Sequence, residues 1–171
     1  SSEEVVPPLW SKEWFRFVAD TGRWDRPRTH RTASFLAQSP WPRDLVGAAM
    51  QRLRDVFTPE LVKPVFAEPR SFPTLYSLLV APLSTPANCE SLRIGLDLCR
   101  AGRIPPRLVR RLATEESHRG ARFELAFLAA SRCAGVRYRF EPTRRRQIRS
   151  PDFLLGFEKP VFVELKAPRE S

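Results

Sequence analysis

Residues 150–166 read SPDFLLGFEKPVFVELK, and this segment decides the predicted fold of the chain. It contains two strand-like runs, Asp152–Phe157 and Val161–Lys166, in which apolar residues dominate. The three residues between them include a proline, which favours a turn. We therefore predict an antiparallel hairpin with its turn centred on Glu158.

This hairpin fixes which residues face one another. With Glu158 at the centre, the numbers of opposed residues sum to about 316, so Asp152 faces Glu164 and Leu154 faces Phe162. Opposed residues share a face of the sheet, and alternation along the strand adds Lys166 to the face that carries Glu164. Two carboxylates and a lysine are thus predicted to lie together.

The facing carboxylates of Asp152 and Glu164 indicate a metal site. Like charges directly across a ladder repel one another, and a divalent cation between them removes the penalty. Hard oxygen ligands suit Mg²⁺ or Mn²⁺, and such an ion polarises a scissile phosphate and activates a bound water. Lys166 is predicted to position that water and to offset developing charge. Val163 and Leu165 point the other way, into the core.

The segment before the hairpin is predicted to contribute a helix and a third strand. Thr114 is a candidate N-cap, Glu115 follows it in the first turn, and Gly135 is a candidate terminator. Val136–Phe140 alternates in the manner of a half-buried strand. A helix followed by three strands predicts an α+β core. Glu124 lies within an apolar run of this helix and needs a partner, for which a metal or Lys166 is a candidate.

Residues 1–112 are predicted to form a separate, mostly helical module, because most of the 17 prolines divide this region into short pieces. Residues 113–171 then form the second domain. Helices are expected near 12–19, 44–57, 74–79 and 90–101, and again after Pro105. Asp44 is a plausible N-cap of the second helix, and Gly102 a plausible terminator of the fourth. The aromatic residues Trp10, Trp14, Phe15 and Phe17 are interpreted as a core patch.

The C-terminal motif resembles the PD-(D/E)xK nuclease superfamily. The resemblance is carried by Ser150–Leu155, Val161–Lys166 and the preceding Arg119–Glu124, and covers roughly residues 114–168. It implies a restriction-endonuclease-like core and Mg²⁺-dependent hydrolysis of phosphodiesters. It also implies a backbone-carbonyl metal ligand at Leu165 and a metal-site acid at Glu124. Such cores continue beyond the lysine, whereas this sequence ends at Ser171, so a homodimer, a partner subunit or further residues are expected to complete the core.

The charge of the chain favours a polyanionic partner. Lys and Arg number 29 against 19 Asp and Glu, which leaves a net charge of +10. Residues 137–149 hold six arginines and one glutamate, and residues 100–111 hold five arginines and no acid. Guanidinium groups match phosphate oxygens, so the arginines of the first run are predicted to contact nucleic acid: Arg137, Arg139, Arg144, Arg145, Arg146 and Arg149. The alternative is a solvated surface.

Several other classes of function lack support in the sequence. The longest apolar stretch, near residues 75–83, is too short to span a bilayer. The three cysteines have no C-x-x-C spacing typical of a zinc knuckle, and no glycine-rich phosphate loop is present. His30 and His118 have no cysteine or serine at a spacing typical of a metal or catalytic site. Both imidazole rings are therefore expected to be surface or core groups with ordinary hydrogen-bond partners.

The sequence therefore predicts an intracellular, metal-dependent nuclease that acts in the cytoplasm, nucleoid or nucleus, and on DNA rather than RNA. Export as an effector is a further alternative. A nucleic-acid-binding or assembly subunit that has the same motif but does not cut is the alternative from a different class. The predicted catalytic residues are Asp152, Glu164, Lys166 and Glu124.

Overall fold

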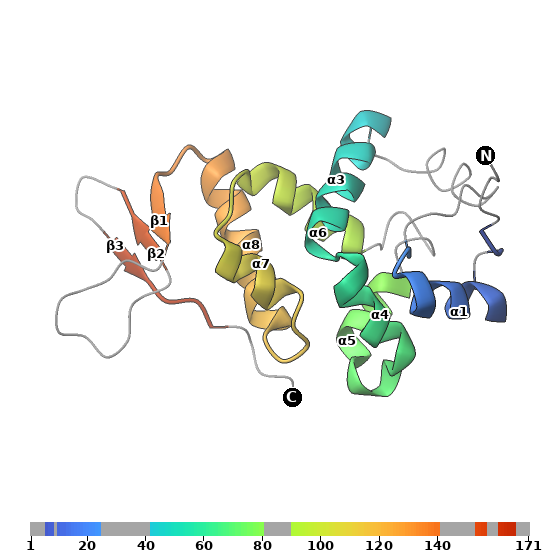
Figure 1. Cartoon of the computed structure of the whole chain (residues 1–171). Coiled ribbons are helices and arrows are strands. Elements are labelled where there is room, and N and C mark those ends of the chain that lie inside the picture. The colour runs from blue at the N-terminus through green and yellow to red at the C-terminus, as the bar shows by residue number, and fades with distance from the viewer. Residues whose placement is uncertain are drawn as a thin grey trace.

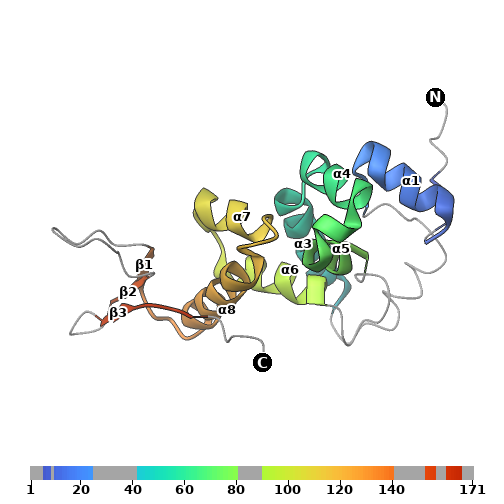
Figure 2. The same ribbon diagram turned by 90° about the horizontal axis from the view of Figure 1, so that it is seen from below.

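The computed structural model describes residues 6–8, 10–24, 42–80, 90–140, 153–156 and 161–166. Its helices are α1 (Lys12–Thr21), α3 (Arg43–Val56), α4 (Pro59–Ala67), η1 (Pro69–Ser71), α5 (Pro73–Val80), α6 (Glu90–Ala101), α7 (Pro106–Leu112) and α8 (His118–Cys133). Three short strands follow, β1 (Tyr138–Phe140), β2 (Phe153–Leu155) and β3 (Val161–Val163). Figures 1 and 2 show α1 at one end of the helices and the strands at the other end of the molecule, beyond α7 and α8.

Helix α1 has a capping residue at each end and an apolar side that faces the core. The Ser11 side chain accepts a hydrogen bond from the Trp14 backbone N–H, and Gly22 ends the helix in a left-handed conformation. Trp14 and Val18, four residues apart, are fully buried on one side of the helix. The predicted aromatic core patch is confirmed, because Trp10, Phe15 and Phe17 pack against the same core.

The centre of the fold is the close contact between α3 and α6. Gly95 on α6 lies directly against the backbone of Ala49 on α3, where a Cβ atom would collide with the Ala49 carbonyl.

The predicted helix at 90–101 is confirmed residue for residue, and Gly102 terminates it with a left-handed φ of 70°. The short helix α4 was not predicted from the sequence, although Pro59 at its first position is a typical start.

One hydrophobic core runs through most of the described helices. Leu108 and Leu112 of α7 belong to the same buried cluster as Ala121 and Leu125 of α8. Helix α8 packs against both α6 and α7. The core therefore crosses position 112, where the sequence predicted a division into two domains.

The predicted α+β class is wrong. The predicted restriction-endonuclease-like core is therefore also wrong as the architecture of the described residues. These residues form an all-α fold of seven α-helices. Strands β1, β2 and β3 contain three residues each and pair antiparallel in that order. Strands of globular proteins usually have five or six residues, so these can bury little surface. Helix α8 buries its apolar side on other helices instead of covering a sheet.

Within these short strands, the predicted register is confirmed where it can be compared. Leu154 pairs with Phe162, as the hairpin centred on Glu158 requires, and Phe153 pairs with Val163. The predicted strands extended too far at their C-terminal ends, because β2 ends at Leu155 and β3 at Val163. Asp152 lies outside the described residues.

Two predicted N-caps are wrong. Helix α8 begins at His118, with Ser117 at its N-cap and not Thr114, whereas the Glu115 carboxylate serves another helix. It accepts hydrogen bonds from the backbone N–H groups of Thr74 (2.7 Å) and Leu75 (3.0 Å), and so caps α5. Helix α3 has Pro42 at its N-cap, and Asp44 lies in its first turn. Gly135 ends α8 as predicted, with a φ of 72°.

Candidate functional site

The segment that carries the predicted lysine, β3 and the three residues after it, has the predicted alternation. Val163 and Leu165 are partly buried and pack against the hydrophobic core, whereas Glu164 and Lys166 are exposed. The side chains of Val163 and Leu165 thus hold this segment against the hydrophobic core, and those of Glu164 and Lys166 face solvent. The proposed metal contact of the Leu165 carbonyl stays a prediction.

The metal site itself lies only partly within the described residues. Asp152, the predicted partner of Glu164, is outside them. Within the part of the chain that the structure describes, no three His, Cys, Asp or Glu residues lie close enough together to hold a metal ion. Glu164 supplies one hard oxygen donor, which fits Mg²⁺ or Mn²⁺ in type.

Glu124 is buried, with 7% of its surface exposed, as the apolar run around it predicted. Its carboxylate forms an ion pair of 2.6 Å with the Arg111 guanidinium of α7. Arg111 thus meets the requirement for a partner that the sequence interpretation assigned to a metal or to Lys166. The sequence contained the signal for this pair, since a buried acid needs a cationic partner and residues 100–111 contain five arginines.

A polar seam joins α7 to α8 around this ion pair. The Ser117 hydroxyl donates to the Arg111 carbonyl at 2.9 Å. The buried His118 ring bonds through Nδ1 to the Leu112 carbonyl at 2.6 Å, so Nδ1 carries the proton. His118 is therefore a satisfied core imidazole, as expected. This seam holds the N-terminus of α8 in place, and no nucleophile–base pair is formed by these contacts.

The predicted nucleic-acid contacts are only partly described. Arg137 is exposed just before β1, and Arg139 lies in β1 with a side chain that is outside the description. Arg144, Arg145, Arg146 and Arg149 are outside the described residues. In the second basic run, Arg100, Arg103, Arg107 and Arg110 are exposed.

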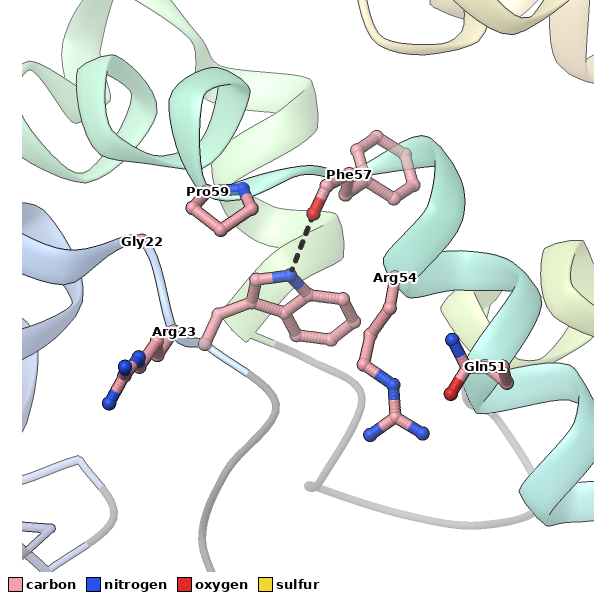
Figure 3. Close-up of a pocket in the computed structure, with 7 residues that line it drawn as sticks. Gly22, Arg23, Gln51, Arg54, Phe57 and Pro59 are labelled. Atoms are coloured by element: carbon pink, nitrogen blue, oxygen red, sulfur yellow. Dashed lines mark hydrogen bonds between the residues drawn. The ribbon is translucent and has the colours of Figure 1, made fainter. Parts of the chain in front are cut away.

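Sequence reasoning missed two adjoining pockets along α3, which we call together the α3 groove. The first, of about 420 Å³, contains Arg23 and Arg54. Figure 3 shows Arg23 on the α1 side of this pocket and Gln51 with Arg54 on the α3 side. The second, of about 550 Å³, contains Arg52 and Arg103, and Gln51 lines both pockets. These arginines are far apart in the sequence, so no local pattern predicted that they gather.

Cys99, which lines the second pocket of the α3 groove, is not expected to act as a nucleophile. Burial raises the pKa of the Cys99 thiol, and the charge of Arg52 offsets this effect only in part. The thiol is therefore protonated at neutral pH. Since the thiolate is the reactive form, nucleophilic chemistry is not expected at this position.

No helix among the described residues combines the length and the apolar character needed to cross a membrane. In comparisons with known proteins, no family model, no curated protein and no solved structure matches the chain.

Proposed function

We propose that the chain is a nucleic-acid-binding protein that uses a divalent metal to hydrolyse phosphodiester bonds, in DNA rather than in RNA. The observation that supports this most directly is the arrangement of residues 163–166. Glu164 and Lys166 are exposed together, while Val163 and Leu165 attach the segment to the core. The proposal depends on this local arrangement and on the motif, not on the class of the fold.

Each predicted residue has a separate task in this proposal. Asp152 and Glu164 would hold Mg²⁺ or Mn²⁺, which supplies Lewis-acid activation of the phosphate and of a water. Lys166 orients the attacking water and offsets the negative charge that develops on the phosphate. The Leu165 carbonyl is a further candidate ligand. A DNA substrate would place this activity inside the cell.

Binding without cleavage is the second candidate function, and one contact favours it. Glu124 is the acid that the resemblance assigns to the metal site, and its carboxylate is paired with Arg111. If Glu124 stays in this ion pair, a metal site has one carboxylate fewer. The arginine-rich character of the chain fits either candidate function.

A cleavage assay separates the two candidates. The chain is incubated with linear, circular and single-stranded DNA and with RNA, with and without Mg²⁺. We expect Mg²⁺-dependent cleavage of DNA that is lost in Glu164→Gln and in Lys166→Ala. Glu68→Gln and Lys63→Ala are matched controls, because both residues are exposed on the helical side of the molecule.

Metal binding tells the roles of the two residues apart. Calorimetry with Mn²⁺ should show weaker binding in Glu164→Gln and unchanged binding in Lys166→Ala, because the lysine acts on the water and phosphate. Wild-type cleavage by both variants would remove the nuclease proposal. Binding of DNA with no cleavage by the wild-type chain would establish the second candidate.

A further inference from the structure

The α3 groove consists of two basic pockets that share one lining residue. Gln51 lines both pockets, so they adjoin along one side of α3. Arg23 follows α1, Arg52 and Arg54 lie on α3, and Arg103 follows α6. Four guanidinium groups from three separate segments thus line a single groove. Among the described residues that line it there is no aspartate or glutamate. Gln51, which lines both pockets, donates a hydrogen bond to the Asp55 carboxylate at 3.2 Å.

The first pocket has a rigid floor. Gly22 has a left-handed φ of 71°, and any Cβ atom there would collide with the backbone of Pro59. The Trp24 indole, 2% exposed, donates a hydrogen bond to the Phe57 carbonyl at 3.3 Å. The end of α1 is therefore locked against the α3–α4 connection. This contact holds the segment that carries Arg23 opposite the helix that carries Arg54 (Figure 3).

The second pocket is fixed in a similar way. The Arg52 guanidinium donates to the Gly102 carbonyl at 2.8 Å, which ties α3 to the end of α6. Leu98 is fully buried beneath this pocket, and Ala48 and Leu98 give it an apolar lining beside its arginines. A groove whose walls are held before a ligand arrives loses less entropy when it binds one.

The geometry points to the α3 groove as a binding site for successive phosphate groups of a nucleic-acid strand. Guanidinium groups match phosphate oxygens in a bidentate manner. Two adjoining basic pockets suit a ligand that carries more than one phosphate, which a polynucleotide supplies and inorganic phosphate does not. The apolar lining of the second pocket suits the carbon atoms of a sugar of the same strand. This inference rests on the nucleic-acid-binding part of the proposed function and not on cleavage.

The test removes one exposed arginine from each pocket. Arg54→Gln with Arg103→Gln is compared with Arg16→Gln and Arg70→Gln, which remove the same charge from exposed positions outside the groove. Binding of a labelled single-stranded oligonucleotide is measured by fluorescence anisotropy at several salt concentrations, in the presence of EDTA. Circular dichroism confirms that both double variants retain the wild-type helical content.

We expect the slope of log affinity against log salt to become less negative by about 1.4 in the groove variant, since each single-strand phosphate contact contributes about 0.7. The control variant should keep the wild-type slope. Equal changes in the two double variants, or no change in the groove variant, would overturn the inference, because a general charge effect would then explain the binding.

Two further measurements separate the remaining explanations. Pyrophosphate that binds the wild-type chain as tightly as the oligonucleotide, and loses this binding in the groove variant, would overturn the assignment to a nucleic-acid strand in favour of a free phosphate compound. Cleavage of the same oligonucleotide by the wild-type chain is then measured with Mg²⁺ present. A chain that shows the expected slopes but does not cleave supports the groove and contradicts only the nuclease proposal.

Discussion

Glu115 shows how one side chain can serve an element far from it in the sequence. Its carboxylate accepts hydrogen bonds from the first N–H groups of α5, which have no partner within that helix. Partial burial raises the pKa of the carboxyl. The hydrogen bonds from Leu75 and Thr74 and the charge of His118 outweigh burial, so the pKa lies below its ordinary value.

We predict that Glu115→Gln lowers the free energy of unfolding by about 1 kcal/mol at neutral pH, as the loss of a helix cap does. Because the pKa is lowered in the folded state, this stabilisation is present above the unfolded pKa of about 4.3 and is lost as the pH falls through the folded pKa. Urea unfolding at a series of pH values should show the variant and the wild-type chain converging below about pH 4. The exposed neighbour Glu116 provides the control, and an equal loss in Glu116→Gln would contradict the capping role.

The ion pair between Glu124 and Arg111 makes a second residue-level prediction. Glu124 is buried, whereas Arg111 remains partly exposed, so solvent screens the pair in part. We expect Glu124→Ala to lower the free energy of unfolding by about 1–3 kcal/mol, because it leaves the Arg111 charge without this partner. Glu124→Gln should cost less, since the amide oxygen can still accept a hydrogen bond.

A double-mutant cycle with Arg111→Ala measures this coupling in EDTA, where no divalent metal can contribute. A coupling energy of zero would show that the contact does not stabilise α7 on α8. If destabilisation in Glu124→Ala instead appeared only with Mg²⁺ present, Glu124 would act chiefly as a metal ligand.

At the scale of elements, the crossing of α3 and α6 depends on one missing side chain. A Cβ atom at Gly95 would lie 2.5 Å from the Ala49 carbonyl oxygen, and a backbone atom cannot move aside without shifting the helix. We predict that Gly95→Ala lowers the free energy of unfolding by about 1–3 kcal/mol through overpacking.

Gly47 on α3 offers a matched control for this prediction, because nothing lies within 4 Å of its added Cβ atom. Gly47→Ala should raise the free energy of unfolding by about 0.5–1 kcal/mol, since alanine is the better helix former. Thermal unfolding of the two variants checks both signs. A stabilised Gly95→Ala variant would mean that the two helices lie further apart than described.

At the scale of the whole molecule, the small sheet has two strand edges. The order β1-β2-β3 leaves β1 and β3 each with one edge that is not paired within this sheet. Edges of this kind favour pairing with another chain. We therefore predict that the chain forms a homodimer or binds a partner subunit. Light scattering after size exclusion, over a range of concentrations, tests the first of these. A monomer that cleaves DNA at every concentration would contradict the prediction.

Local signals in the sequence predicted those features that depend on neighbouring residues. The helix at 90–101, its terminator Gly102, the pairing of Leu154 with Phe162 and the opposite exposure of Glu164 and Leu165 are of this kind. Each follows from a period of 3.6 or 2 residues, or from a glycine with a positive φ. The fold class was beyond the reach of these signals, because the extent of the strands depends on what they can pack against.

The sequence by itself determined that the chain is strongly basic, that helices form most of the described part of its first two thirds, and that an acid and a lysine alternate with apolar residues near its end. Only the tertiary structure decided that Glu115 caps α5, that Arg111 neutralises Glu124, and that four arginines from three segments line the α3 groove. The physical reason is that charge and periodicity are local properties of a chain, whereas the partner of a buried or concave polar group is selected by packing between residues distant in sequence.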